Sequence, residues 1–326
     1  MSPLNSALFK NTTNDNIVHP DYFVISGFAG IPQTKYYYVF LCFVYALTII
    51  GNTFVMFMIY IDHCLHSPKY IVVFNLALSD LCGSTALVPL VIDTFLFKSH
   101  LMSFHACLTS MFFVLGFITV QSFSLAALSY DRCVAICFPL RFNDIVTNKS
   151  MSFIIAILWI IAALAFLVAV IYINKLSFCR SNVINSYFCD HGPLHLLACN
   201  DNTPSTVMNW ACQVVIFWLP VIFIVSSYIC ITRALLKIAA ASERLKAMKT
   251  CTSHLILVAV FYLPLCVSFA LGGALHMNAR IINMSLASVM PQMLNPFIYS
   301  LKTDEFRESI KKLYRRKKMH ITGRNT

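Results

Sequence analysis

Charged residues are scarce in this chain: Asp, Glu, Lys and Arg make up 11% of its 326 residues, whereas hydrophobic residues make up 59%. Soluble globular domains carry roughly 25% charged residues, so this composition argues against a water-soluble fold. The hydrophobic residues are also unevenly distributed. They are gathered into seven runs of at least twenty residues, separated by short polar segments.

A run of that length crosses a hydrocarbon core of about 30 Å as a helix. The sequence therefore predicts an all-α fold, a seven-transmembrane helix bundle. The expected spans cover residues 36–61, 71–97, 106–130, 151–173, 207–231, 253–277 and 281–301. They divide the chain into an N-terminal segment (1–35), a seven-span domain (36–302) and a tail (303–326).

The distribution of Lys and Arg predicts which end of the bundle faces the cytosol. If the N-terminus is outside, 18 of these residues flank the inner side and 6 flank the outer side, as the positive-inside rule requires. We therefore expect a multi-pass plasma-membrane protein with an extracellular N-terminus and a cytoplasmic C-terminus. Anionic lipids of the inner leaflet are expected partners and account for the net charge of +11, so no nucleic-acid partner is predicted.

The two ends of the chain carry one pattern each. Asn11 begins an Asn-Thr-Thr tripeptide that fits the N-glycosylation pattern and lies in the outside segment, so we expect it to be glycosylated. In the tail, Phe306, Ile310 and Leu313 recur at spacings of four and three. This spacing predicts a short amphipathic helix over 303–314 that lies on the membrane.

Only two Asp, Glu, Lys or Arg residues fall within the expected spans, Asp80 and Asp93. Asp80 lies about mid-depth, and Asn52 and Asn295 are at comparable height, counting a rise of about 1.5 Å per helical residue. Polar groups are costly in hydrocarbon, so these three side chains are expected to have partners or a function. The favoured interpretation is a hydrogen-bonded knot between helices. The alternative is a site that holds a cation or a proton. Asp93 is near the outer boundary, where a solvated helix end is the favoured interpretation and attraction of a cation is the alternative.

Four cysteines stand apart from those inside spans. Cys107 begins the third span at its outer end, while Cys179, Cys189 and Cys199 share the second outer connection, which faces an oxidising compartment during biogenesis. A bridge from Cys107 to that connection would hold a long loop over the bundle, and the other two loop cysteines would close a local ring. Four cysteines allow three pairings, and spacing alone does not choose among them.

Asp131 and Arg132 close the third span at the inner boundary. An adjacent acid can hold a guanidinium until a conformational change frees it. An Arg at a cytosolic helix end is also a common interfacial anchor, and position alone does not separate the two interpretations. Proline residues inside the later spans remove backbone hydrogen bonds and permit kinks, which are compatible with a switching bundle but also occur in proteins that do not switch.

Two other classes of membrane protein are less well supported. A transporter is expected to show internal repeats, and none is visible by eye. An intramembrane enzyme is expected to carry a His-Glu-x-x-His motif, a Gly-x-Ser-x-Gly motif or paired acids in facing spans, and the sequence has none of these. We therefore expect neither an enzyme nor a bound cofactor or metal.

Short motifs recur span by span. They are Gly51-Asn52, Leu-Ala-Leu-Ser-Asp ending at Asp80, Cys107, Asp131-Arg132, Trp159, Pro220, Tyr228, Pro264 and Asn-Pro-Phe-Ile-Tyr over 295–299. Together they resemble the rhodopsin-like G protein-coupled receptors over nearly the whole chain. Three longer stretches look like the odorant receptor branch of that superfamily, namely 129–137 (SYDRCVAIC), 246–255 (KAMKTCTSHL) and 291–301 (PQMLNPFIYSL).

This resemblance implies the disulfide pairing and the coupling residues. It pairs Cys107 with Cys189 and Cys179 with Cys199. It implies that Arg132 engages the terminal helix of a heterotrimeric G protein, expected to be the stimulatory, cyclic AMP-raising type. The switch residues that it implies are Asp131, Arg132, Tyr228, Tyr262, Asn295, Pro296 and Tyr299, with Tyr228 and Tyr299 moving beneath Arg132 and Tyr262 acting as the sensor under the ligand.

The chain departs from the family pattern in two places. Cys133 stands where the usual residue after Asp-Arg is Tyr, which puts loop contacts with the G protein in doubt but not the role of Arg132. Gln121 and Gln292 stand near Asp80, so sodium regulation is not inherited from the resemblance.

A small ligand is expected between the outer halves of the helices, beneath the second outer loop. Amine receptors of this superfamily usually place an acid near Val114, so its absence argues against an amine held in that way. The leading hypothesis is a small, mostly uncharged odorant, and the alternative is a non-odorant metabolite or peptide. The expected lining residues are Met111, Val114, Leu115, Ile118, Thr119, His191, Asn209, Cys212, Gln213, Ile216, Leu265, Phe269 and Ser288, with Asp190 beside His191.

Overall fold

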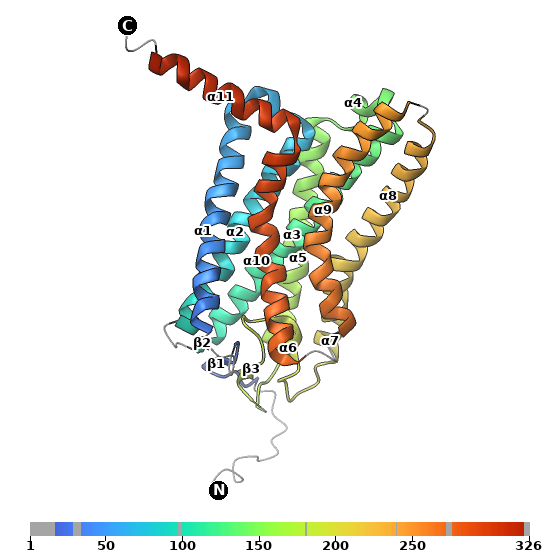
Figure 1. The fold of residues 1–326 in the computed structure, drawn as a ribbon. Helices are drawn as coiled ribbons and strands as arrows, with labels where there is room; N and C mark the ends of the chain where they lie inside the picture. Colours follow the sequence, from blue (N-terminus) through green and yellow to red (C-terminus); the bar gives the residue numbers. More distant parts are fainter. Residues whose placement is uncertain are drawn as a thin grey trace, which may run out of the picture.

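The computed structural model describes residues 17–28, 34–96, 100–179, 181–238, 240–271 and 276–322. Its long helices lie side by side in one bundle (Figure 1), which confirms the predicted fold class. They are α1 (Thr34–Ile61), α2 (Pro68–Leu96), α3 (Phe104–Cys137), α5 (Asn148–Asn174), α9 (Ala241–Leu271), α10 (Met277–Lys302) and a continuous rod made of α7 (Thr203–Gln213), the π-helical turn η3 (Val214–Trp218) and α8 (Leu219–Leu236). The expected glycosylation site Asn11 lies outside the described residues.

Six of these rods, within the part of the chain that the structure describes, are long and apolar enough to cross a membrane. The seventh, α10, is 26 residues long, but its Asn, Gln and Ser residues lower its hydropathy. Large apolar side chains also face outward: Phe153 on α5 is 67% exposed and Ile222 on α8 is 62% exposed. Apolar surface of this kind suits contact with lipid, so the chain is a multi-pass membrane protein.

The third long helix is central. α3 packs against α2, α5, α8 and α9, whereas α1 packs against α2 and α10. Ser103 begins α3 as its N-cap, because its side chain accepts a hydrogen bond from the Ala106 N–H, which satisfies one of the free donors at the helix start. Thr147 and Ser150 form a capping box that begins α5 in the same manner.

One end of the bundle, here called the sheet end, carries three short strands (bottom of Figure 1). β1 (Tyr22–Ile25) lies between β2 (Leu101–Ser103), to which it is antiparallel, and β3 (Val183–Ile184), to which it is parallel. The sheet joins the N-terminal segment to two loops that are distant in sequence. It was not predicted, because strands of two to four residues leave no periodic signal.

The opposite end, here called the α11 end, carries the short elements η1 (His63–Leu65), η2 (Pro139–Arg141) and α4 (Phe142–Ile145), and α11 (Asp304–Thr322). α11 leaves the bundle at the top of Figure 1. It is longer than the helix expected over 303–314. Its Phe306 is fully buried and Ser309 donates a hydrogen bond to Asp62 Oδ2 at 2.5 Å, so the first half of α11 is docked onto the bundle.

Several helices are longer than the predicted spans. α9 begins at Ala241, twelve residues before the expected start at 253, and α3 continues to Cys137 instead of stopping at 130. Hydropathy detects only the apolar part of a helix. Charged residues such as Glu243 and Arg244 continue the helical hydrogen bonding in water, where their side chains are solvated.

Candidate functional site

A cavity of about 170 Å³ lies near the sheet end, between α3, the α7–η3 rod, α9, α10 and the loop that contains α6 (His191–His195). Its volume is below the roughly 300–1,000 Å³ typical of pockets for drug-sized ligands, so it suits a small compact molecule. The expected residues that line it are Leu115, Ile118, His191, Asn209, Cys212, Gln213, Ile216, Leu265 and Ser288, together with Asp190.

Three expected lining residues with described side chains do not line this cavity. Met111 and Val114 are buried in the hydrophobic core of the sheet end, and they do not line the described cavity. Thr119 is also fully buried, and its hydroxyl donates to the Leu115 carbonyl of the same helix at 2.8 Å. The helix therefore uses the Thr119 hydroxyl that we expected to meet a ligand. The side chain of Phe269 lies outside the described residues.

The cavity also has walls that the sequence did not reveal. Tyr187 and Phe188, in the loop between α5 and α7, line it, and the Tyr187 hydroxyl lies 2.7 Å from Ser288 Oγ on α10. Further lining comes from Gln121, Phe166, Gly192, Phe217, Phe261, Met284 and Ala287. A loop that folds back over a bundle has no periodic sequence pattern. The one signal that could have identified Tyr187 and Phe188 is their closeness in sequence to Cys189.

His191 is the most distinctive polar group of this cavity. Its Nδ1 lies 3.2 Å from Asn209 Oδ1, and its Nε2 is buried without a hydrogen-bond partner among the described residues. Burial, and then the nearby His195, lower the pKa of His191 to about 4. The ring is therefore neutral at pH 7, and with Nδ1–H donating to Asn209 its Nε2 is free to accept a hydrogen bond.

Two disulfides fix the loop over the cavity. Cys107 at the start of α3 is joined to Cys189, and Cys179 is joined to Cys199, with Cα–Cα distances of 5.3 and 5.8 Å. Both distances lie within the usual range for disulfides. These are the pairs that the family resemblance implies.

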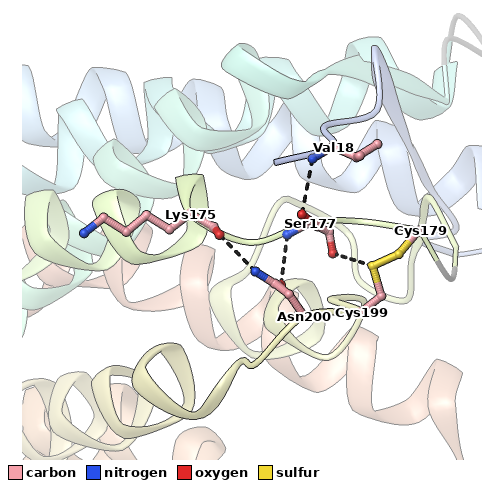
Figure 2. Close-up of a disulfide and its surroundings, with 6 residues drawn as sticks. All are labelled: Val18, Lys175, Ser177, Cys179, Cys199 and Asn200. Atoms are coloured by element: carbon pink, nitrogen blue, oxygen red, sulfur yellow. Dashed lines mark hydrogen bonds between the residues drawn. A yellow bond between two sulfur atoms is a disulfide. The ribbon is translucent and has the colours of Figure 1, made fainter. Parts of the chain in front are cut away.

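The second disulfide lies in a hydrogen-bonded loop region (Figure 2). The Ser177 N–H donates to Asn200 Oδ1 at 3.0 Å, and Asn200 Nδ2 donates to the Lys175 carbonyl at 3.1 Å. The Val18 N–H donates to Ser177 Oγ at 3.2 Å. The N-terminal segment is thereby held to the same loop that forms the cavity roof.

A hydrogen-bonded link connects the cavity wall with the helices below it. Ser122 on α3 donates to the carbonyl of Ile216 at 2.6 Å, and the Tyr262 hydroxyl lies 2.7 Å from Ser122 Oγ. Ile216 lines the cavity, as does Phe261, the neighbour of Tyr262 on α9. Tyr262 itself is buried and does not line the cavity, so its contact with the cavity wall runs through these two neighbours.

The polar residues at mid-depth are only partly joined to one another. Asn295 Nδ2 donates to Asp80 Oδ2 at 2.7 Å. The Asn52 amide donates instead to two backbone carbonyls, Thr48 and Gln292, each at 2.9 Å. Asn52 therefore ties α1 to α10 and does not bond directly to Asp80 in the described structure.

A second cavity, of about 520 Å³, lies at the α11 end. Arg132 lines it, and its Nη2 lies 3.5 Å from Asp131 Oδ2, so the carboxylate holds the guanidinium in this conformation. Tyr299 also lines it. The remaining lining residues are Lys69, Tyr70, Val73, Leu128, Lys249, Ser253, His254, Leu257, Thr303, Asp304 and Glu305.

His254 also lines this cavity, and the sequence pattern did not single it out, although it lies within the matched stretch 246–255. It is buried, and its Nε2 donates to the Leu125 carbonyl of α3 at 3.0 Å. Its Nδ1 accepts from the Tyr228 hydroxyl of α8 at 2.8 Å. His254 thus joins α3, α8 and α9 beside Arg132.

The bundle thus has a small cavity near one end and a larger, arginine-lined cavity at the other. The olfactory receptor family model matches residues 41–317. Olfactory receptor 1F1 of Homo sapiens is 34% identical over 89% of this chain and 94% of its own length. Olfactory receptor 51F2 of Homo sapiens is 33% identical over 95% of this chain and 92% of its own length. Olfactory receptor 1468 of Rattus norvegicus is 32% identical over 91% of this chain and 96% of its own length.

The chain therefore belongs to the olfactory receptor family. This is a family of receptors and not of enzymes, and the predicted resemblance is confirmed.

Proposed function

We propose that this protein is an odorant receptor that binds a small molecule in the cavity near the sheet end and activates a heterotrimeric G protein at the α11 end. One observation carries the proposal: the Ser122–Tyr262 link joins the wall of the cavity to α9, the helix whose inner part carries His254 beside Arg132. A ligand that binds one arrangement of α9 more tightly than another shifts the receptor towards that arrangement, and with it the conformation of the cavity at the α11 end.

The cavity supports a small, uncharged ligand that carries one hydrogen-bond donor. Most of its lining is apolar, including Leu115, Ile118 and Phe261. The unpartnered Nε2 of His191 accepts the donor, which makes a small alcohol or phenol the best fit. An unpaired buried acceptor costs about 1–3 kcal/mol, so a ligand without a hydroxyl binds less tightly.

At the α11 end, Arg132 is the residue proposed to contact the G protein once Asp131 releases it. Tyr299 lines the same cavity as Arg132, and Asn295 and Pro296 lie one helical turn before it on α10. Tyr228 is joined to the cavity through its hydrogen bond with His254. The proposed partner is the stimulatory, cyclic AMP-raising type. This places the α11 end and the tail 303–326 in the cytosol, and residues 1–35 with the sheet end outside the cell, as the Lys and Arg distribution favours.

Cyclic AMP in cells that express the chain tests the proposal. Pools of volatile alcohols, phenols and matched ethers are applied to the wild type and to Arg132→Ala, with surface display measured for both. We expect a response to a hydroxyl compound that is lost in Arg132→Ala. Silence to every pool with proven surface display, or an undiminished response in Arg132→Ala, would contradict the proposal.

A further inference from the structure

Cys133 and Cys137 form a pair of thiols on α3, one helical turn apart. Their Sγ atoms lie 4.0 Å from each other, and neither is in a disulfide. Both side chains are partly exposed, so the pair can be reached from outside the bundle. Cys133 directly follows Arg132, at the α11 end of α3.

The separation of the two sulfurs matches a bridging metal ion. Two bonds of about 2.3 Å, the length of a zinc–thiolate bond, place sulfurs about 3.8 Å apart at a tetrahedral angle and about 4.6 Å apart when collinear. The observed 4.0 Å lies between these limits. An ion can therefore bridge the pair with only small side-chain rotations and no backbone movement.

The number of ligands decides which ion fits. Cys230 of α8 is near enough to interact electrostatically with Cys133, but the described residues contain no group of three or more His, Cys, Asp or Glu side chains placed to hold one ion. Structural zinc sites need four ligands. Cu(I) is a soft d¹⁰ ion that prefers thiolate sulfur and is satisfied by two such ligands.

We propose that Cys133 and Cys137 form a two-thiolate Cu(I) site at the α11 end of α3. Binding replaces two S–H bonds by two S–Cu bonds and releases two protons to solvent, with no change in oxidation state. The site rests on the proposed orientation, because cytosolic thiols are kept reduced, and it does not depend on the ligand or on the G protein. The bridge closes one helical turn beside Arg132.

Titration of the full-length, detergent-solubilised receptor with the coloured Cu(I)–bicinchoninate complex under anaerobic conditions tests the site. We expect the wild type to withdraw one equivalent of Cu(I) more than Cys133→Ser. Cys137→Ser and the double variant are expected to lose that same single equivalent, because each removes one half of a shared site. Cys42→Ser, at a free exposed cysteine on α1, is the matched control and is expected to behave as wild type.

Two outcomes would overturn the two-thiol site. Equal Cu(I) uptake by the wild type and the double variant would show that the two cysteines bind no Cu(I). A double variant that loses twice the equivalents lost by each single variant would show that the two cysteines bind Cu(I) independently. X-ray absorption of the copper-loaded wild type supplies a measurement that needs no variant. Two sulfur neighbours are expected, and three sulfurs, with loss of uptake in Cys230→Ser, would contradict a two-coordinate site.

Discussion

The Tyr262 hydroxyl on α9 lies 2.7 Å from Ser122 Oγ on α3, and Ser122 donates to the carbonyl of Ile216 in the cavity wall. In the same conformation Asp131 Oδ2 lies 3.5 Å from Arg132 Nη2. The tie between α3 and α9 therefore belongs to the state in which Arg132 is held.

Tyr262→Phe removes this tie while keeping the ring. A net hydrogen bond of about 1 kcal/mol is worth roughly a fivefold change in a two-state equilibrium, so we expect basal cyclic AMP to rise by a few-fold. Tyr60→Phe, at a tyrosine that is 79% exposed on α1, is the matched control. Basal activity equal to wild type at equal surface display would show that the tie does not restrain the receptor.

The pKa of His191 predicts how stability depends on pH. Because burial lowers that pKa to about 4 from its ordinary value of 6.5, the unfolded chain binds a proton more readily than the folded one. The fold is therefore destabilised as pH falls from about 6.5 towards 4. Thermal unfolding at pH 7.5 and pH 5 is expected to show a smaller loss for His191→Gln than for wild type, and an equal loss would argue against a neutral buried ring.

Gly51 marks a close approach of α1 and α10. A Cβ at Gly51 would lie 3.0 Å from Pro296 Cβ, whereas a Cβ at Gly116 on α3 would meet nothing within 4 Å. Overpacking of this kind typically costs about 1–3 kcal/mol, so Gly51→Ala is expected to lower the unfolding temperature. Gly116→Ala is the matched control, and helix propensity favours it by up to about 1 kcal/mol. Equal unfolding temperatures for the two variants would refute the packing argument.

Asp80 tests the two interpretations of the mid-depth polar group. A knot held by the Asp80–Asn295 hydrogen bond predicts the same ligand potency in sodium chloride as in choline chloride at equal ionic strength. A sodium-dependent shift in potency that disappears in Asp80→Asn would favour the cation site instead. Ligand concentration–response curves for both proteins in both salts make the comparison.

The loop disulfides are open to a direct chemical test. Proteolysis without reduction, followed by mass spectrometry, is expected to yield linked peptides that contain Cys107 with Cys189 and Cys179 with Cys199. A Cys107–Cys179 peptide as the main product would overturn the pairing. Removing both cysteines of the second pair is expected to weaken the ligand response, because the loop region of Figure 2 supports the roof of the cavity.

Much of the helical fold was predictable because each span can be recognised from its own consecutive residues. Residues 151–173 form an apolar run that needs no partner to be recognised, and α5 (Asn148–Asn174) follows it closely. α9 was predicted twelve residues too short, because its first turns are charged and lie beyond the apolar part. The three-stranded sheet was missed, because its strands are paired across more than 75 residues and hold no periodic pattern.

For the site, helical position predicted lining residues such as Leu115, Asn209 and Ile216, since side chains on one face of a helix recur regularly. It did not separate Thr119, whose hydroxyl bonds within its own helix, from a residue that faces the cavity. Nor did it find Tyr187, because the path of the loop between α5 and α7 depends on its disulfides and on contacts with α10.

The sequence by itself determined the class of protein, the seven long helices of the bundle and the family, because hydropathy and short motifs are properties of consecutive residues. Only the tertiary structure decided which side chains meet. It brought His191 to Asn209, Tyr262 to Ser122 and Asn295 to Asp80. Such pairs depend on the rotation and depth of each helix, which are set by packing among all the helices at once and not by any one segment.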